Sequence, residues 1–143
     1  MEKIYIVYWT QGGNTEAMAN AVADGAKAAG KEVVLLTPSE ANVEDLKAVP
    51  AFAMGCPAMG AEVLEESEME PFVQEVEGFV SGKQVALFGS FGWGDGQWMR
   101  DWVDRMTVAG ATVIGGEGVI AQEAPDDDAV AKCNALGKSL AEI

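Results

Sequence analysis

Neutral hydrogen-bond donors are concentrated in the segment from Thr10 to Thr15. This segment contains two glycines and the side chains of Thr10, Asn14 and Thr15, but no lysine or arginine. Free backbone amides at a helix start, together with hydroxyl and amide groups, can cradle a phosphate. The missing lysine argues against a nucleoside-triphosphate loop, and the Gly-x-Gly-x-x-Gly dinucleotide fingerprint is absent. The residues therefore favour a terminal phosphate monoester, while an ordinary capped turn between strand and helix would use the same residue types.

Two further segments carry groups suited to a flat aromatic ligand. In residues 56–62 the thioether of Met59 precedes Gly60, and glycine takes a positive φ at low cost. In residues 89–96 the indole of Trp93 lies between glycines, where it has little local chain to pack against, so it is suited to stacking on a ring. Taken singly, Met59 and Trp93 are more commonly explained by core packing or by accidental surface placement. Their predicted position at the same edge as a phosphate cradle favours a shared ligand.

Alternating strand and helix patterns position these segments. Apolar β-prone runs predict strands at 3–9, 33–36, 51–55 and 84–90, with 112–114 and 119–120 closing the sheet. Four-residue spacing, caps and breakers predict helices at 15–29, 68–80, 97–109 and 126–140, with a brief helix capped by Asn42. This alternation predicts one α/β domain over residues 1–143, a three-layer, doubly wound, five-stranded parallel sheet. Ligands of such folds bind beyond the carboxyl ends of the strands, which selects residues 10–15, 56–62 and 90–96.

The net charge of the chain limits the classes of partner that it can bind. The chain has 23 acidic and 9 basic residues and a formal net charge of −14, which repels nucleic acid and anionic lipid surfaces and favours a basic protein face. Cys56 and Cys133 are far apart and no histidine accompanies them, so we expect neither a metal nor an iron–sulfur site. No apolar run is long enough to span a bilayer and the start lacks signal-peptide features, so we expect a cytoplasmic protein and, by default, a monomer.

Several blocks in a fixed order carry a family resemblance. They are Val7-Tyr8-Trp9, Gly13-Asn14-Thr15-Glu16, Gly55-Cys56-Pro57-Ala58-Met59-Gly60, the acidic run 62–68, and Ala86 to Gly96. With these blocks the whole chain resembles the short-chain flavodoxins, especially the clostridial type. The resemblance implies the flavodoxin-like strand order 2-1-3-4-5 and a non-covalent FMN.

The resemblance also implies a set of cofactor-binding residues. They are Thr10, Gln11, Gly12, Gly13, Asn14 and Thr15 at the phosphate; Pro57, Ala58, Met59, Gly60, Ala61 and Glu62; and Ser90, Phe91, Gly92, Trp93 and Gly94. Met59 and Trp93 would cover the two flavin faces, and Glu62 would accept from the ring N3–H. The Gly60 peptide would rotate on reduction and stabilise the semiquinone. This chain departs from the family at Gln11, where glycine is usual, at Gly12, where a hydroxyl residue is usual, and at Ala61, where clostridial relatives often carry aspartate.

The implied function is single-electron transfer between redox enzymes, chiefly through the semiquinone and hydroquinone states at low potential, with no substrate turnover of its own. Transient docking to basic surfaces of reductases and electron acceptors would use the acidic run from Glu62 to Glu70, although acidic residues are also common at solvated helix starts. A flavin-dependent NAD(P)H/quinone reductase on the same fold is the main alternative. A phosphoacceptor signalling domain is disfavoured because Trp9-Thr10 and Gly55-Cys56 stand where its acidic residues are needed.

Overall fold

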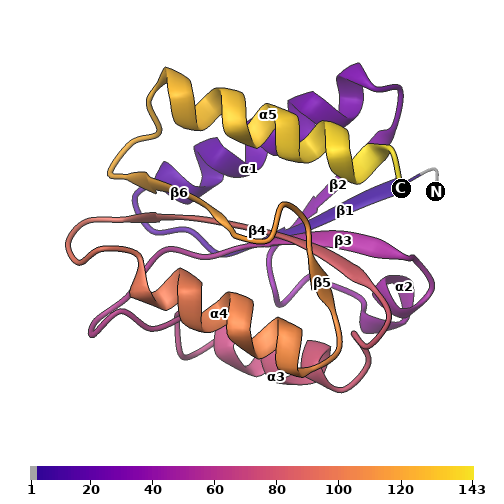
Figure 1. Ribbon diagram of the computed structural model, residues 1–143, viewed down its shortest axis with the longest axis horizontal. Helices are drawn as coiled ribbons and strands as arrows, with labels where there is room; N and C mark the ends of the chain where they lie inside the picture. The colour runs from indigo at the N-terminus through magenta and orange to yellow at the C-terminus, as the bar shows by residue number, and fades with distance from the viewer. Residues whose placement is uncertain (1–2) are drawn as a thin grey trace.

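A parallel β-sheet lies between two layers of helices in the computed structural model, which describes residues 3–143 (Figure 1). The strands are β1 (Lys3–Tyr8), β2 (Glu32–Leu36), β3 (Ala51–Gly55), β4 (Gln84–Phe91), β5 (Thr112–Val113) and β6 (Val119–Gln122). The helices are α1 (Asn14–Ala28), α2 (Val43–Lys47), α3 (Met69–Glu77), α4 (Gln97–Val108) and α5 (Asp127–Ala141). Helices α1 and α5 cover one face of the sheet, and α3 and α4 cover the other. Within residues 3–143 no helix is long and apolar enough to cross a membrane.

The strand order is β2-β1-β3-β4-β5, and all pairs are parallel, which confirms the predicted doubly wound arrangement. The fifth position is shared by two short strands, because β6 also pairs with β4, from Phe88 to Phe91. Gly115 and Gly116, both at φ +81°, interrupt this position between β5 and β6. Tyr8 of β1 is level with Gly55 of β3, so the carboxyl ends of these strands meet at one edge.

Two apolar layers hold the sheet. On one face Met18, Val22 and Ala26 of α1 are fully buried, as their four-residue spacing predicts. On the other, Trp98 and Trp102 of α4 are buried in a cluster that includes apolar side chains of β3, β4 and α3, so these indoles belong to the core. Strand β3 is buried along its whole length, which explains its continuous apolar sequence.

Helices α1 and α5 touch through their backbones. A Cβ at Gly25 would overlap the carbonyl group of Asn134, and a Cβ at Gly137 would overlap the carbonyl oxygen of Val22. Real side chains cannot occupy such positions, so glycine at both sites allows the two helices to approach closely.

The element boundaries agree with the predicted ones within two residues except at α3. The apolar pattern predicts a helix to Val80, but α3 ends at Glu77 and Gly78 is its C-cap. Val80 is still buried, and its amide still donates to the carbonyl of Val76. Buried apolar residues therefore continue beyond the end of the helix, which is why their periodicity alone predicts a helix that is too long.

Candidate cofactor-binding site

Three loops meet where β1, β3 and β4 end, and backbone hydrogen bonds join them. The amide of Trp9 donates to the carbonyl of Gly55 at 3.0 Å, which ties the end of β1 to that of β3. The amide of Ala58 donates to the carbonyl of Ser90 at 3.0 Å, which ties the second loop to β4. The structure thus brings the three predicted segments to one edge of the sheet.

The first loop turns into α1 through two glycines in the left-handed region. Gly12 has φ +79°, and Gly13, the N-cap of α1, has φ +94°. A Cβ built on either glycine meets no atom of the described residues within 4 Å. The Thr10 hydroxyl oxygen accepts from the amide of Glu16 at 3.3 Å, so this side chain helps to organise the helix start.

Thr15 provides the test of whether a phosphate fits this loop. Its side chain is 1% exposed, and its hydroxyl has no hydrogen-bond partner among the described residues. A buried hydroxyl without a partner is costly, and such groups indicate a missing acceptor. It lies in the first turn of α1, where the helix amides favour an anion. The donor set therefore fits the phosphate of a nucleotide cofactor, which Thr15 would hold through its hydroxyl.

The second loop forms a small hairpin. Met59 and Val63 exchange two backbone hydrogen bonds, of 2.8 and 2.9 Å, around the turn at residues 60–62. Gly60 has φ +48° and Glu62 has φ +56°, a left-handed conformation that is uncommon for a residue with a side chain. Met59 is partly buried.

The third loop places an indole outside the core. Trp93 is 66% exposed, the largest exposed aromatic side chain of the described residues. The side chains of Ser90 and Phe91, by contrast, contact other parts of the protein. The Ser90 hydroxyl donates to the carbonyl of Glu123 at 2.9 Å, and the centroid of the Phe91 ring lies 5.7 Å from that of Trp98. Trp93 can therefore adapt to a ligand, whereas Ser90 and Phe91 can offer only their backbone groups or a ring edge.

Most of the acidic run that follows the second loop has a structural role, which corrects the interpretation of the whole run as a docking face. Glu65 is 5% exposed, and its carboxylate accepts from the hydroxyl of Ser67 and, at 2.8 Å, from the amide of Glu68. Burial alone would raise the pKa of Glu65, but these hydrogen bonds outweigh it and lower the pKa below its ordinary value. The exposed members of the run are Glu66 and Glu68.

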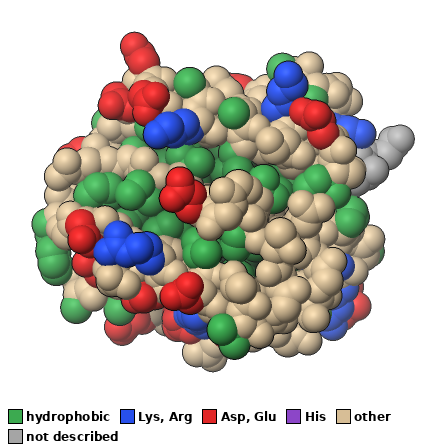
Figure 2. All heavy atoms as spheres, in the orientation of Figure 1, with side chains coloured by type: hydrophobic (Ala, Val, Ile, Leu, Met, Phe, Trp, Pro, Cys, Tyr) green, Lys and Arg blue, Asp and Glu red, His purple; other side chains and the backbone are tan. Residues whose placement is uncertain are grey.

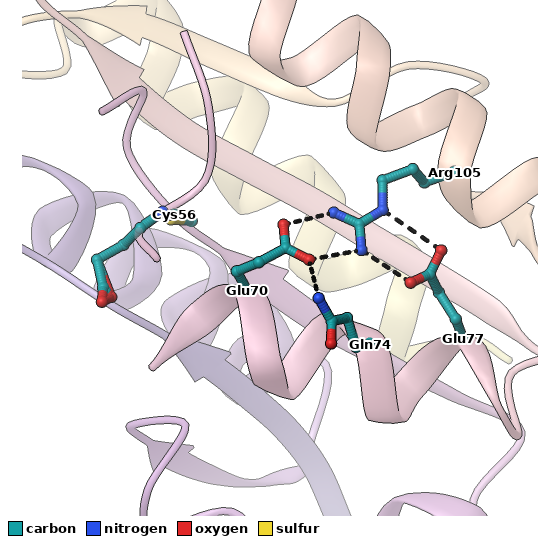
Figure 3. Close-up of polar contacts among 6 residues, drawn as sticks. Cys56, Glu70, Gln74, Glu77 and Arg105 are labelled. Atoms are coloured by element: carbon teal, nitrogen blue, oxygen red, sulfur yellow. Dashed lines mark hydrogen bonds and ion pairs between the residues drawn. The ribbon is translucent and has the colours of Figure 1, made fainter. Parts of the chain in front are cut away.

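Glu70 belongs to an ion-pair network between α3 and α4 (Figure 3). The guanidinium of Arg105 binds Glu70 at 2.8 Å and Glu77 at 2.8 Å, and Gln74 donates to Glu70. The hydrogen bond from Arg105 lowers the pKa of the Glu70 carboxyl. Because all three charged side chains are about two-thirds covered, this network ties the two helices together and is not free for a partner.

Cys56 is the first residue of the second loop, directly after β3, and it is fully buried. Burial raises the pKa of its thiol to about 12, and the indole N–H of Trp98 donates to its carbonyl at 3.1 Å. Burial likewise raises the pKa of Cys133 to about 12. Asp126 caps α5 by accepting from the amide of Ala129 at 2.8 Å. Within residues 3–143 no cluster of three or more potential metal ligands is found.

Sequence reasoning missed the structural partner of Glu62. Its Oε1 accepts from the amides of Gly96 at 3.3 Å and Gln97 at 3.1 Å, at the start of α4. The only signal in the sequence is Gly96 at the N-cap of α4, which leaves that helix without a side-chain cap of its own. The fold and this ligand edge define a doubly wound α/β protein suited to a phosphorylated cofactor.

Known proteins identify the family. A sequence model of the family described as Flavodoxin matches residues 6–135. The chain is 48% identical over 138 residues to a flavodoxin of Clostridium beijerinckii, covering 96% of this chain and 99% of the relative. It is 45% identical over 139 residues to a flavodoxin of Megasphaera elsdenii, covering 97% and 98%. The solution structure of the two-electron reduced M. elsdenii flavodoxin superposes with a TM-score of 0.87 at 44% identity, covering 98% of this chain and 99% of that one. The chain belongs to the flavodoxin family.

Flavodoxins are electron-transfer proteins that bind FMN non-covalently and turn over no substrate of their own. Membership confirms the predicted fold class, cofactor and function class, and it does not favour the reductase alternative. The residues that hold FMN in this chain stay a prediction.

Proposed function

We propose that residues 1–143 form a single flavodoxin-like domain that holds FMN at the three-loop edge. The proposed binding residues are those expected from the sequence: Thr10, Gln11, Gly12, Gly13, Asn14, Thr15, Pro57, Ala58, Met59, Gly60, Ala61, Glu62, Ser90, Phe91, Gly92, Trp93 and Gly94. The observation that supports this best is the buried hydroxyl of Thr15 at the start of α1, which has no hydrogen-bond partner in the part of the chain that the structure describes. When bound, FMN supplies the redox chemistry, and the protein sets its potentials.

The visible spectrum of the purified protein, before and after addition of FMN, tests the proposal. We expect a yellow protein whose released chromophore is FMN, or a colourless one that takes up added FMN with quenching of flavin fluorescence. A colourless protein that leaves added FMN fluorescent and free would contradict it.

We further propose that the protein cycles chiefly between the semiquinone and hydroquinone states at low potential. A net charge of −14 and the Glu62 carboxylate near the ring make additional negative charge costly. A redox titration monitored by absorbance should therefore resolve two one-electron steps, the second at the more negative potential. A single two-electron step without an intermediate species would refute this.

The proposed partners are basic surfaces of redox enzymes, bound transiently by a monomer in the cytoplasm, without nucleic acid or membrane. Exposed acidic side chains lie at the edge where the strands end: Glu16, Glu66, Glu68 and Glu123, together with Asp95, which is paired with Arg100 at 2.8 Å. Lysines lie where strands begin or helices end, at the opposite edge: Lys3, Lys31, Lys47 and Lys138. Lys3 and Lys47 are paired there with Glu32 and Glu44, whereas Glu16, Glu66, Glu68 and Glu123 form no ion pair within residues 3–143. The unpaired acidic side chains would turn the cofactor edge toward a positive surface. The face in Figure 2 has a band of hydrophobic side chains between α4 and α5.

Electron transfer to a basic cytochrome at increasing salt tests this orientation. We expect the rate to fall about tenfold between low and physiological ionic strength, because the Debye length shortens to about 8 Å. The double variant E66Q/E68Q should reduce that salt dependence, whereas E75Q, which removes an exposed charge near the far end of α3, should leave it unchanged. A rate that is insensitive to salt, or equal effects of the two variants, would contradict the proposal.

A further inference from the structure

The turn of the second loop and the start of α4 are joined through a single carboxylate oxygen. Oε1 of Glu62 accepts from the amides of both Gly96 and Gln97. Gly96 is the N-cap of α4 and offers no side chain, so Glu62 supplies the cap from a loop far away in the sequence. Negative charge is also favourable at this end of a helix. Oε2 of Glu62 accepts no hydrogen bond within the described part of the chain.

The backbone of Glu62 is held in a strained conformation. Its φ of +56° is one of two positive values at non-glycine residues among the described residues. A residue with a side chain adopts this region at a cost, and it persists only when the surroundings hold it there. The hairpin bonds between Met59 and Val63 hold one side of the turn, and the α4 amides hold the carboxylate. The strain therefore points to a requirement on where this side chain lies.

Gly94 provides the room for the carboxylate. A Cβ at position 94 would lie 2.5 Å from both Cδ and Oε1 of Glu62, and the backbone there has φ +87°. The positive φ favours glycine, and the contact means that a Cβ at this position would displace the Glu62 carboxylate. Gly94 follows Trp93 directly, so the residue that would stack on the ring and the residue that admits Glu62 are neighbours.

We infer that Gly94 and the first amides of α4 are positioning elements for Glu62. The Gly96 and Gln97 amides donate to its Oε1, Gly94 leaves room for the carboxylate, and Oε2 remains as a preorganised acceptor for the imide N–H of the flavin. This inference rests on the proposed function, in which Glu62 accepts from that N–H. The start of α4 holds the Glu62 carboxylate in place before the cofactor binds. Recognition of the ring edge therefore depends on Gly94, which need not touch the ring.

The experiment compares three full-length proteins: wild type, G94A and G30A. Gly30 has the same φ of +87°, and a Cβ there would meet nothing within 4 Å, so G30A carries the backbone strain without the contact. Dissociation constants are measured by fluorescence titration with FMN and with 3-methyl-FMN, which lacks the imide hydrogen. Hydrogen exchange of the Gly96 and Gln97 amides is followed by NMR in the cofactor-free protein, with E62A as a further variant.

We expect wild type and G30A to bind FMN about tenfold to a hundredfold more tightly than 3-methyl-FMN, as for loss of a hydrogen bond to a carboxylate. In G94A this preference should fall to about twofold or less, and in both G94A and E62A the two amides should exchange at least about tenfold faster than in wild type. Equal amide exchange in wild type and E62A, or an unchanged FMN preference in G94A, would overturn the inference. Absence of any preference in wild type would instead refute the acceptor role of Glu62 within the proposed function, and with it the ligand part of the inference, even if the amides remain protected.

Discussion

Replacement of Thr15 by valine should raise the free energy of unfolding of the cofactor-free protein and lower its affinity for FMN. Valine keeps the shape and β-branching of threonine but has no hydroxyl. In the free protein the Thr15 hydroxyl is buried and has no hydrogen-bond partner within residues 3–143, which costs about 1–3 kcal/mol. T15V removes that cost, so the free energy of unfolding should rise by about 1–2 kcal/mol and Tm by a few degrees, about 3 °C per kcal/mol for a chain of this size.

The effect on binding has the opposite sign. A hydrogen bond from a hydroxyl to a charged phosphate contributes about 1.5–3 kcal/mol, so T15V should weaken FMN binding by about tenfold to a hundredfold. Thermal unfolding of the cofactor-free protein gives the first quantity, and fluorescence titration gives the second. Riboflavin, which has no phosphate, should bind T15V and wild type equally.

Thr10 provides the contrasting variant. Its hydroxyl oxygen accepts from the amide of Glu16 at 3.3 Å in the free protein, so T10V should lower the free energy of unfolding by about 0.5–1.5 kcal/mol. The reasoning would be refuted if T15V were less stable than wild type without cofactor. It would also be refuted if riboflavin lost as much affinity for T15V as FMN does.

Three further predictions concern groups outside the cradle. Because burial raises the pKa of Cys56 and Cys133 to about 12, neither thiol should react with a maleimide at pH 8 within the time in which the urea-unfolded chain reacts fully; prompt labelling of the native protein would contradict this. E65Q should lower the free energy of unfolding by about 1.5–3 kcal/mol at pH 7 in urea titrations. Folding lowers the pKa of Glu65. The difference in free energy of unfolding between wild type and E65Q should therefore be complete above the ordinary carboxyl pKa and shrink as the pH falls through the lowered pKa of the folded protein. A difference that grows in acid would refute the assignment. G137A should cost about 3 kcal/mol or more by the same assay, despite the better helix propensity of alanine, because its Cβ would overlap the carbonyl oxygen of Val22; a stabilised G137A would contradict the close helix contact.

Local patterns predict most of the fold. The run Ala51–Gly55 is buried on both faces, and the four-residue spacing of Met18, Val22 and Ala26 marks a single buried helix face. Such signals depend on burial within one element, so they are readable without knowledge of the neighbours. Long elements bounded by caps or glycines, such as α1 and α4, are therefore placed to within one residue.

What the sequence does not reveal depends on contacts between distant segments. The pairing of Glu62 with the start of α4 joins residues more than thirty positions apart. Nothing in the acidic run distinguishes Glu65, which is buried and hydrogen-bonded, from Glu66, which is exposed. The same run has the composition of a solvated face, and only the turn that Ser67 and Glu68 make around Glu65 shows otherwise. The division of the fifth strand position also depends on how β5 and β6 each align along β4.

The backbone contact between α1 and α5 has a consequence for how a cofactor enters. Where two helices meet at glycines, no layer of side chains can yield to let one slide along the other. The segment of α1 around Val22 and Gly25 is thereby held against α5, and the first turn with Thr15 extends from this fixed segment. We therefore expect a ligand to enter and leave through rearrangement of the loops around Met59 and Trp93. The start of α1, which receives the phosphate, should keep its position during these steps.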